Sequence, residues 1–384
     1  MSILEQQEKL FILDCMRAFI NGNTFSPDKI SFSNLNWDRM IQLARAGRVL
    51  PFLIHMCEKE GFLIHLPKKY QTWFQSFLMY SEWENHKRIT EFKKVKDLFA
   101  KNRISFIPLK GIALSHLVYQ KTPFRYMADM DLLIRESDLE RTRNLLFNDG
   151  YVMSEPKNRW QAKAMMDIIG RADFVKAHIN VDLQWSPKFF VEGKFVSWDY
   201  EGAWQRAEPF RQLGENTFML SAADQVLYLA LQILNDMEIN VVHMIQLLDL
   251  TLIMQKYQVR LSHLSEQIAA LGPSMEKRLS GFFIMVEKHF FEHKIYEKSS
   301  IESIRFFEPF FESLLSPKPN FTFKEILHSI QSLRERFLFV AGYFVPSRAI
   351  LQKKAPLNFL GTILCYFDHW RKQCFSLFKL LLRQ

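Results

Sequence analysis

The sequence lacks the cysteine spacings that mark metal knuckles and disulfide frameworks. Its four cysteines are scattered and form no C-x-x-C pair, and they are Cys15, Cys57, Cys365 and Cys374. Neither a zinc knuckle nor a set of structural disulfides is therefore indicated. The start of the chain is acidic and polar, unlike a signal peptide, and no stretch reaches the roughly 18 apolar residues of a membrane span. These absences predict a soluble, reduced, cytoplasmic protein.

Glycine and proline are absent from Tyr70 to Asn102, where apolar residues recur every three or four positions. This spacing predicts one long helix with at most one break. The apolar stripe of residues 4–20 predicts an earlier helix, and a further one is expected to begin near Trp37. Phenylalanine is unusually frequent, with 36 copies, which is typical of bulky packing between helices.

The pattern changes to short strands and helices between residues 103 and 220. The predicted strands are Ile104–Leu109, Met127–Ile134, Tyr151–Met153 and a hairpin of Arg171–Ala177 with Ile179–Trp185. Ile112–Tyr119 is a predicted short helix. A capping box at Ser137–Glu140 is expected to open another helix, which ends at Gly150. This stretch therefore predicts a compact mixed unit.

The pattern after residue 220 is helical again, and Ser221–Asp224 resembles a helix start. A chain of 384 residues exceeds one ordinary core. We therefore expect an α+β protein with a helical region at 1–102, a small mixed-sheet α/β core at 103–220 and a helical region at 221–384. The segment Phe359–Leu382 allows two interpretations. The apolar stripe favours a terminal helix packed on the helical region, and its basic residues would suit weak peripheral contact with anionic lipid.

The excess of basic residues, 50 against 41 acidic, gives a net charge of +9. Such a surplus attracts phosphates, nucleic acids or anionic membranes, whereas the same surplus spread over a surface does nothing specific. No stable nucleic-acid partner is predicted.

Asp129 and Asp131 lie in the predicted strand Met127–Ile134. Residues two apart in a strand share a face, so both carboxylates are expected to point the same way. Two adjacent carboxylates repel, and a divalent cation with a preference for hard oxygen ligands removes that repulsion. The alternative is a solvated edge strand with two surface aspartates. The apolar residues that follow favour a buried strand and hence a metal site.

Four other residues are candidates for the same site. Asp182, in a second predicted strand, is the natural third carboxylate, and its alternative is a surface residue of a hairpin. Lys110 and Gly111 stand where a strand gives way to a helix, and a helix start accepts phosphate. Arg125 precedes the aspartate pair, where it could reach a phosphate or hold the carboxylates in place. An exposed loop position is its alternative.

These pieces, taken in order, resemble a family of uncharacterised bacterial nucleotidyltransferases found beside surface-polysaccharide and peptide natural-product genes. The motifs that carry the resemblance are Ile107–Gly111, Arg125–Ile134, Leu145–Leu146, Gly150–Tyr151, Val181–Trp185 and Leu248–Leu250. The likeness extends from near Ile30 to near Ile350. It implies a polymerase-beta-like nucleotidyltransferase core in which Lys110 and Gly111 replace the usual glycine-serine loop.

The resemblance implies a Mg²⁺-dependent (or Mn²⁺-dependent) enzyme. It would move a nucleoside monophosphate from a nucleoside triphosphate such as ATP to an unknown hydroxyl or phosphate acceptor. Asp129, Asp131 and Asp182 would hold metal and carry catalysis, while Lys110, Gly111 and Arg125 would bind phosphates.

Two glutamines depart from the family pattern. Gln184 stands where the family commonly has a histidine beside the third carboxylate, and Gln232 stands where a helical histidine is common. Glutamine cannot take up a proton as histidine does. An alternative function is therefore a catalytically degenerate nucleotide-binding or toxin–antitoxin-like module. Retention of the three carboxylates favours activity.

Overall fold

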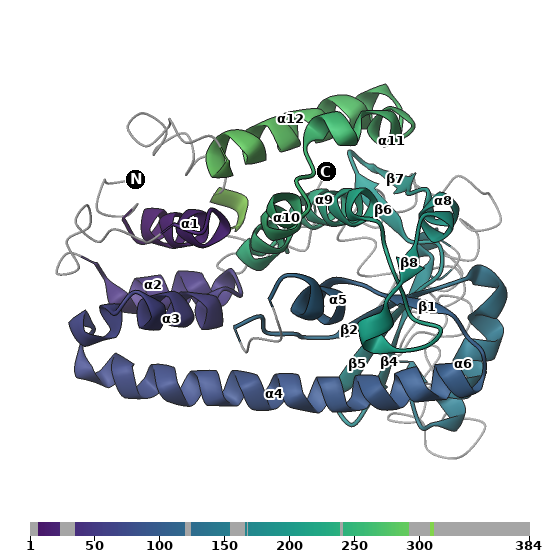
Figure 1. Cartoon of the computed structure of the whole chain (residues 1–384), viewed down its shortest axis with the longest axis horizontal. Helices are drawn as coiled ribbons and strands as arrows, with labels where there is room; N and C mark the ends of the chain where they lie inside the picture. Colours follow the sequence, from purple (N-terminus) through teal and green to yellow (C-terminus); the bar gives the residue numbers. More distant parts are fainter. Residues whose placement is uncertain are drawn as a thin grey trace, which may run out of the picture. The chain divides into compact units, whose positions relative to one another are not determined.

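A computed structural model of the chain describes residues 7–23, 35–119, 124–153, 166, 168–238, 241–291 and 308–310. Helices and a small mixed sheet make up these residues, which confirms the α+β class (Figure 1). The chain divides into two compact units. The first holds the described residues up to Leu133 and from Trp198 onward, and the second holds residues 134–197. The three-region division at 1–102, 103–220 and 221–384 stays a prediction.

The N-terminal helices of the first unit are α1 (Gln7–Ile20), α2 (Trp37–Ala46), α3 (Leu50–Lys59) and α4 (Lys68–Lys101). All of the helices predicted for this part of the chain are confirmed. Asn36 caps α2, because its side chain accepts a hydrogen bond from the Arg39 amide at 3.1 Å. The long helix α4 runs for 34 residues without a break.

The later helices of the first unit are α8 (Tyr200–Gln205), α9 (Ala222–Glu238), α10 (Met244–Lys256), α11 (Ser265–Ala269) and α12 (Pro273–Phe290). The predicted helix start is confirmed, since the Ser221 hydroxyl accepts from the Asp224 amide at 3.1 Å. Almost every side chain of α10 is buried. This helix packs against α1, α5 (Lys110–Leu117) and α9, so it lies at the centre of the unit.

The five-stranded sheet has the order β1-β2-β5-β4-β3. Its strands are β1 (Phe106–Pro108), β2 (Met130–Ile134), β3 (Val152–Met153), β4 (Arg171–Lys176) and β5 (Ile179–Gln184). The predicted hairpin is confirmed, because β4 and β5 pair antiparallel with Asp173 opposite Asp182. Ala177 and His178 form its turn with positive φ angles, as a two-residue hairpin loop requires.

Two further pairs of short strands were not predicted. They are β6 (Lys188–Val191) with β7 (Lys194–Ser197), and β8 (Glu208–Pro209) with β9 (Phe218–Met219). The β6–β7 turn contains Glu192 and Gly193, both with positive φ.

The prediction of a capping box at Ser137 is wrong. Residues Glu136–Asp138 form a short 3-10 turn that leads directly into α6 (Leu139–Asn148). The residue before α6, Asp138, has helical angles and makes no side-chain cap, whereas a capping residue needs extended backbone. The predicted end of this helix is confirmed, since Gly150 follows it with φ of 90°.

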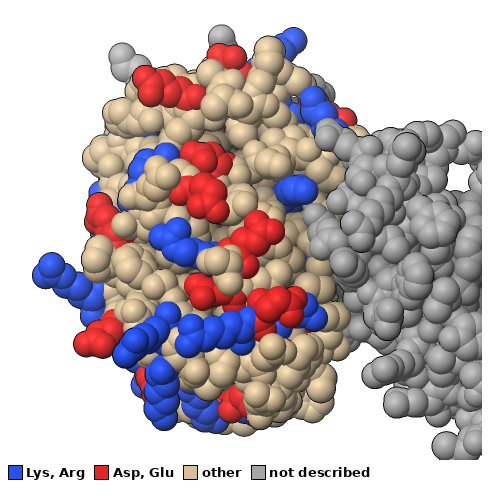
Figure 2. Space-filling model, turned by 90° about the vertical axis from the view of Figure 1, so that its right-hand side faces the viewer, with Lys and Arg blue, Asp and Glu red and all other residues tan. Residues whose placement is uncertain are grey.

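Figure 2 shows a face on which Lys and Arg side chains are interspersed with Asp and Glu. On that face the basic surplus therefore does not form a patch of one sign. Among the residues described, no helix is both long and apolar enough to cross a bilayer. The predicted C-terminal helix at Phe359–Leu382 lies outside the described residues.

Candidate active site

The candidate phosphate and metal residues of the first unit gather where β1 ends and β2 begins. Lys110 and Gly111 open α5 directly after β1, and Asp131 is the second residue of β2. Asp129 lies just before this strand rather than inside it. The Leu109 amide donates to the Asp131 carbonyl oxygen at 2.9 Å, which holds the helix start beside the aspartate pair.

The aspartate pair is close enough for mutual repulsion. Asp131 is 1% exposed, and Asp129 is half-buried. The negative charge of Asp131, and then burial, raises the pKa of Asp129 above its usual value, although Lys110, Arg48 and Arg125 partly offset this effect. The two carboxylates therefore interact, but the prediction that both lie inside one strand is wrong for Asp129, and their common direction stays a prediction.

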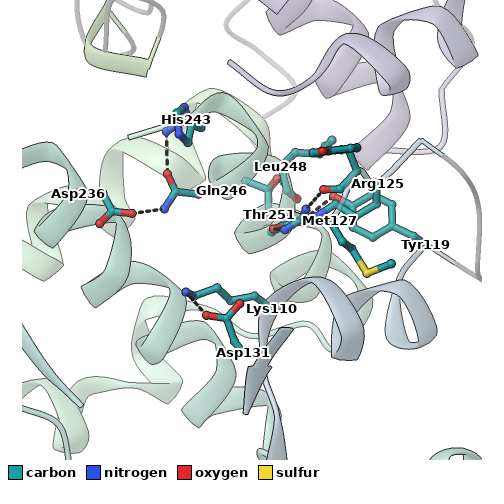
Figure 3. Close-up of polar contacts among 12 residues, drawn as sticks. Lys110, Tyr119, Arg125, Met127, Asp131, Asp236, His243, Gln246, Leu248 and Thr251 are labelled. Carbon is teal, nitrogen blue, oxygen red and sulfur yellow. Dashed lines mark hydrogen bonds and ion pairs between the residues drawn. The ribbon is translucent and has the colours of Figure 1, made fainter. Parts of the chain in front are cut away.

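Lys110 and Gly111 occupy the helix start for different reasons. Lys110 points its amine at the pair, and its Nζ atom lies 2.5 Å from Asp131 Oδ1 (Figure 3). Gly111 lets the Met127 side chain pack directly against the helix start, because a Cβ atom there would lie 2.8 Å from Met127 Cγ. The role of both residues in phosphate binding stays a prediction.

Arg125 is held by a carboxylate from α10. Its Nε and Nη2 atoms donate to Asp249 Oδ1 and Oδ2 at 2.9 and 2.7 Å. The Tyr119 hydroxyl also donates to Asp249, at 2.7 Å. Burial lowers the pKa of Arg125, but Asp249 more than offsets this and raises it above its usual value. The guanidinium of Arg125 thus ties the segment before Asp129 to α10, while both roles expected for Arg125, phosphate binding and holding the carboxylates in place, stay predictions.

The same backbone is also held by α4. Asn85 donates to the Arg125 carbonyl oxygen at 3.0 Å and accepts from the Met127 amide at 2.9 Å. Arg88 donates to the Ala128 carbonyl oxygen at 3.2 Å. Sequence reasoning missed Asn85 and Arg88, since a single polar residue on a long helix gives no local sign of a partner some 40 positions away.

A cluster of amides surrounds Asp236 near the end of α9. Asp236 accepts hydrogen bonds from Gln232 at 2.7 Å, Asn235 at 2.8 Å and Gln246 at 2.7 Å. Gln232, which departs from the family pattern, is therefore a donor to this carboxylate. All three donors to Asp236 are side-chain amides, which do not titrate near neutral pH.

His243 lies at the start of α10 beside this cluster (Figure 3). Its Nδ1 lies 3.1 Å from the Ala46 carbonyl oxygen. A carbonyl oxygen can only accept, so Nδ1 carries the proton. Burial, and then the positive charge of Arg48, lowers the pKa of His243 to about 4. The ring is therefore neutral at physiological pH.

Asp182 belongs to the second unit, where it lies on β5 and is 7% exposed. Gln184 donates to Asp182 Oδ2 at 2.8 Å, and Arg171 Nη1 lies 4.0 Å from the same oxygen. Gln184 thus orients the carboxylate as a fixed donor. The role of Asp182 as a third carboxylate of the site stays a prediction.

The carboxylates of this site suit a metal ion that binds together with a phosphate group. Within the described part of the chain, no group of three or more His, Cys, Asp and Glu side chains is placed to hold a metal. Asp129 and Asp131 offer two carboxylates. Mg²⁺ is commonly held by one or two carboxylates, with phosphate and water oxygens as its other ligands. The pair is therefore suited to a metal–phosphate complex.

The mixed fold of helices and a small sheet is consistent with a nucleotidyltransferase-like fold. The model of a family described as uncharacterised nucleotidyltransferase matches residues 33–290. The chain belongs to this family, which confirms the relationship that its motifs predicted. No curated protein matches the sequence.

Proposed function

We propose that the protein is a Mg²⁺-dependent nucleotidyltransferase that moves a nucleoside monophosphate from a nucleoside triphosphate to a hydroxyl or phosphate acceptor. Mn²⁺ would serve in place of Mg²⁺. The observation that carries the proposal is the pair Asp129 and Asp131, whose repulsion raises the pKa of Asp129 beside the lysine that opens α5. The gene setting of the resembling family supports a role in surface-polysaccharide or peptide natural-product synthesis.

The proposed roles follow from the chemistry of each side chain. Asp129 and Asp131 would hold the metal, which when bound neutralises charge on the phosphates. Lys110 and the start of α5 would bind the phosphates, and Arg125 would help to bind them or hold the pair in place. Asp182 would be the third metal carboxylate and would take the proton from the acceptor hydroxyl. The acceptor oxygen forms a bond to the α-phosphorus. The bond between the α-phosphorus and the oxygen that bridges it to the β-phosphate breaks, and pyrophosphate leaves.

A second candidate is a module that binds nucleotide without turnover, including a toxin–antitoxin-like one. It is favoured by Gln184 and Gln232, which contact Asp182 and Asp236 and cannot exchange a proton. Metal-dependent nucleotide binding without pyrophosphate release, over a wide range of acceptors, would support it.

The decisive test is incubation of the protein with α-labelled nucleoside triphosphates, Mg²⁺ and a lysate of the source cell. We expect a labelled acceptor and released pyrophosphate. The variant Asp129→Asn should not label the acceptor, because it removes one negative charge while the side chain keeps its shape. Asp97→Asn is the matched control, since Asp97 is an exposed aspartate of α4 and its loss should leave labelling intact. Full labelling by Asp129→Asn would overturn the proposal.

A further inference from the structure

Arg48 lies in the short turn between α2 and α3, and α10 fixes the backbone of that turn. The Ile245 amide donates to the Gly47 carbonyl oxygen at 3.0 Å, and His243 donates to that of Ala46. The fit is tight, because a Cβ atom on Gly47 would lie 2.9 Å from Met244 Cβ. The backbone that carries Arg48 is thus held against the start of α10.

The backbone of Arg48 itself has a φ angle of 58°. This left-handed conformation is unfavourable for a residue with a Cβ atom and would be easier for glycine. An outlier of this kind is a reason to ask what its side chain does.

The side chain of Arg48 is partly exposed, and its guanidinium interacts electrostatically with Asp129, Arg125 and Asp236. Burial has the largest effect and lowers the pKa of Arg48, the negative charges of Asp129 and Asp236 oppose this, and the positive charge of Arg125 adds to it. Even so, the side chain of Arg48 makes no hydrogen bond or ion pair with any residue that the structure describes. The Asp129 carboxylate likewise makes none with the described residues.

Two other cations near the pair are already engaged. Lys110 is bound to Asp131, and Arg125 is bound to Asp249. No residue that the structure describes accepts a hydrogen bond from the Arg48 guanidinium, so its donors can serve a ligand bound near Asp129. Its planar set of N–H groups matches the oxygens of a phosphate.

The neighbouring charges define what kind of ligand would fit both open groups. A bare anion near Arg48 would be repelled by Asp129 and Asp131, and a bare metal near Asp129 would be repelled by Arg48. A metal-bound phosphate satisfies both, because its cation faces the carboxylates and its oxygens face the guanidinium.

We propose that Arg48 binds a phosphate group of the metal-bound substrate, so that the N-terminal helices contribute a residue to the substrate site. This inference rests on the proposed function and extends it to a residue outside the mixed core. The shared chemistry is a phosphate oxygen, which can come from the polyphosphate of the nucleotide or from the acceptor. Asp129 would hold the metal, and the polyphosphate is the group that the metal binds, so the electrostatic interaction between Asp129 and Arg48 favours the polyphosphate.

The test is calorimetric titration of the full chain with inorganic pyrophosphate in Mg²⁺, and with inorganic phosphate in the presence of Mg²⁺ and a non-hydrolysable ATP analogue. Arg48→Gln should weaken pyrophosphate binding about tenfold or more, as expected for a lost charge-assisted hydrogen bond. Arg48→Lys should retain part of it. Arg45→Gln is the control, because Arg45 is an exposed arginine of α2 and its loss should change neither affinity.

A second readout separates binding from structure. Mn²⁺ alone, followed by its spin-resonance signal, should bind Arg48→Gln as well as or better than the wild-type protein, because a repelling charge is gone. Weaker Mn²⁺ binding would point to a damaged fold and overturn the inference.

Weakening of phosphate binding alone supports the role of Arg48 and assigns it to the acceptor. Unchanged binding of both probes overturns the inference, while loss of pyrophosphate binding in Asp129→Asn would still support the proposed function. If the wild-type protein binds neither probe, the proposed function and the role of Arg48 both fail.

Discussion

The Nζ atom of Lys110 lies 2.5 Å from Oδ1 of Asp131, a carboxylate that is only 1% exposed. The ammonium group therefore neutralises one member of the aspartate pair without a metal. A metal ligand on Asp131 would compete with this lysine, and phosphates would offer the lysine a new partner.

Lys110→Met should therefore have opposite effects on two ligands. Mn²⁺ alone should bind more tightly, because no ammonium competes for Asp131, and pyrophosphate in Mg²⁺ should bind more weakly. The free protein should lose about 1–3 kcal/mol of stability, since a buried carboxylate loses its partner. Spin resonance, calorimetry and urea unfolding measure the three effects. A parallel loss of metal and pyrophosphate binding would contradict competition.

Asp129→Asn should make the free protein relatively more stable at neutral pH than in acid. The pKa of Asp129 is raised in the folded state above 3.8. Its favourable contribution is therefore present below pH 3.8 and is lost as pH rises through the folded pKa. The variant carries no such penalty. Urea unfolding of both proteins between pH 3.5 and 7.5 checks this, and a variant whose relative stability falls as pH rises would contradict it.

Asp249→Asn should destabilise the protein by about 3 kcal/mol, because it leaves Arg125 buried without its counter-charge. Glu140→Gln is the control. It breaks the exposed pair with Arg143, and exposed pairs contribute less than about 1 kcal/mol. Thermal unfolding measures both. Equal losses would contradict the structural role of Asp249.

The double variant Arg125→Met with Asp249→Leu separates stability from positioning. Replacing both charges by apolar groups should recover much of the stability. Pyrophosphate binding should stay weak, because the segment before Asp129 is no longer tied to α10 by the ion pair between Arg125 and Asp249. Full recovery of binding would show that this hold is not needed.

His243 should make stability depend on pH in mild acid. Its pKa falls from 6.5 to about 4 on folding. Between these two pH values the unfolded chain binds a proton at His243 and the folded protein does not. The contribution of His243 to the free energy of unfolding is therefore present above pH 6.5 and is lost as pH falls toward about 4. In His243→Gln the stability should fall less steeply over that window. Denaturant titrations at half-unit steps measure the slopes, and identical slopes would rule out this contribution.

The sequence predicts local features of this protein well. The long helix α4 and the β4–β5 hairpin each depend on residues a few positions apart, where spacing and turn chemistry determine the outcome. The β6–β7 hairpin was missed although Glu192 and Gly193 separate two apolar runs, which is a signal of the same kind.

The residues that support the site were harder to predict. Asp249 contacts Arg125 across 124 positions, and an isolated charge within an apolar helix indicates only that some buried partner exists. Arg48 has no sequence motif, because its position depends on how a turn meets the start of α10. The capping box failed because a 3-10 turn placed Ser137 in a helical conformation before the helix began.

The segment that carries Asp129 has an implication for dissection of the protein. Its backbone is held by Asn85 and Arg88 from one helix and, through Arg125, by Asp249 from another. A fragment of residues 103–220 would keep all three candidate metal carboxylates and lose every one of these supports. We expect such a fragment to lack the proposed activity even if it folds, and we expect a working piece of this chain to reach from before Asn85 to beyond Asp249.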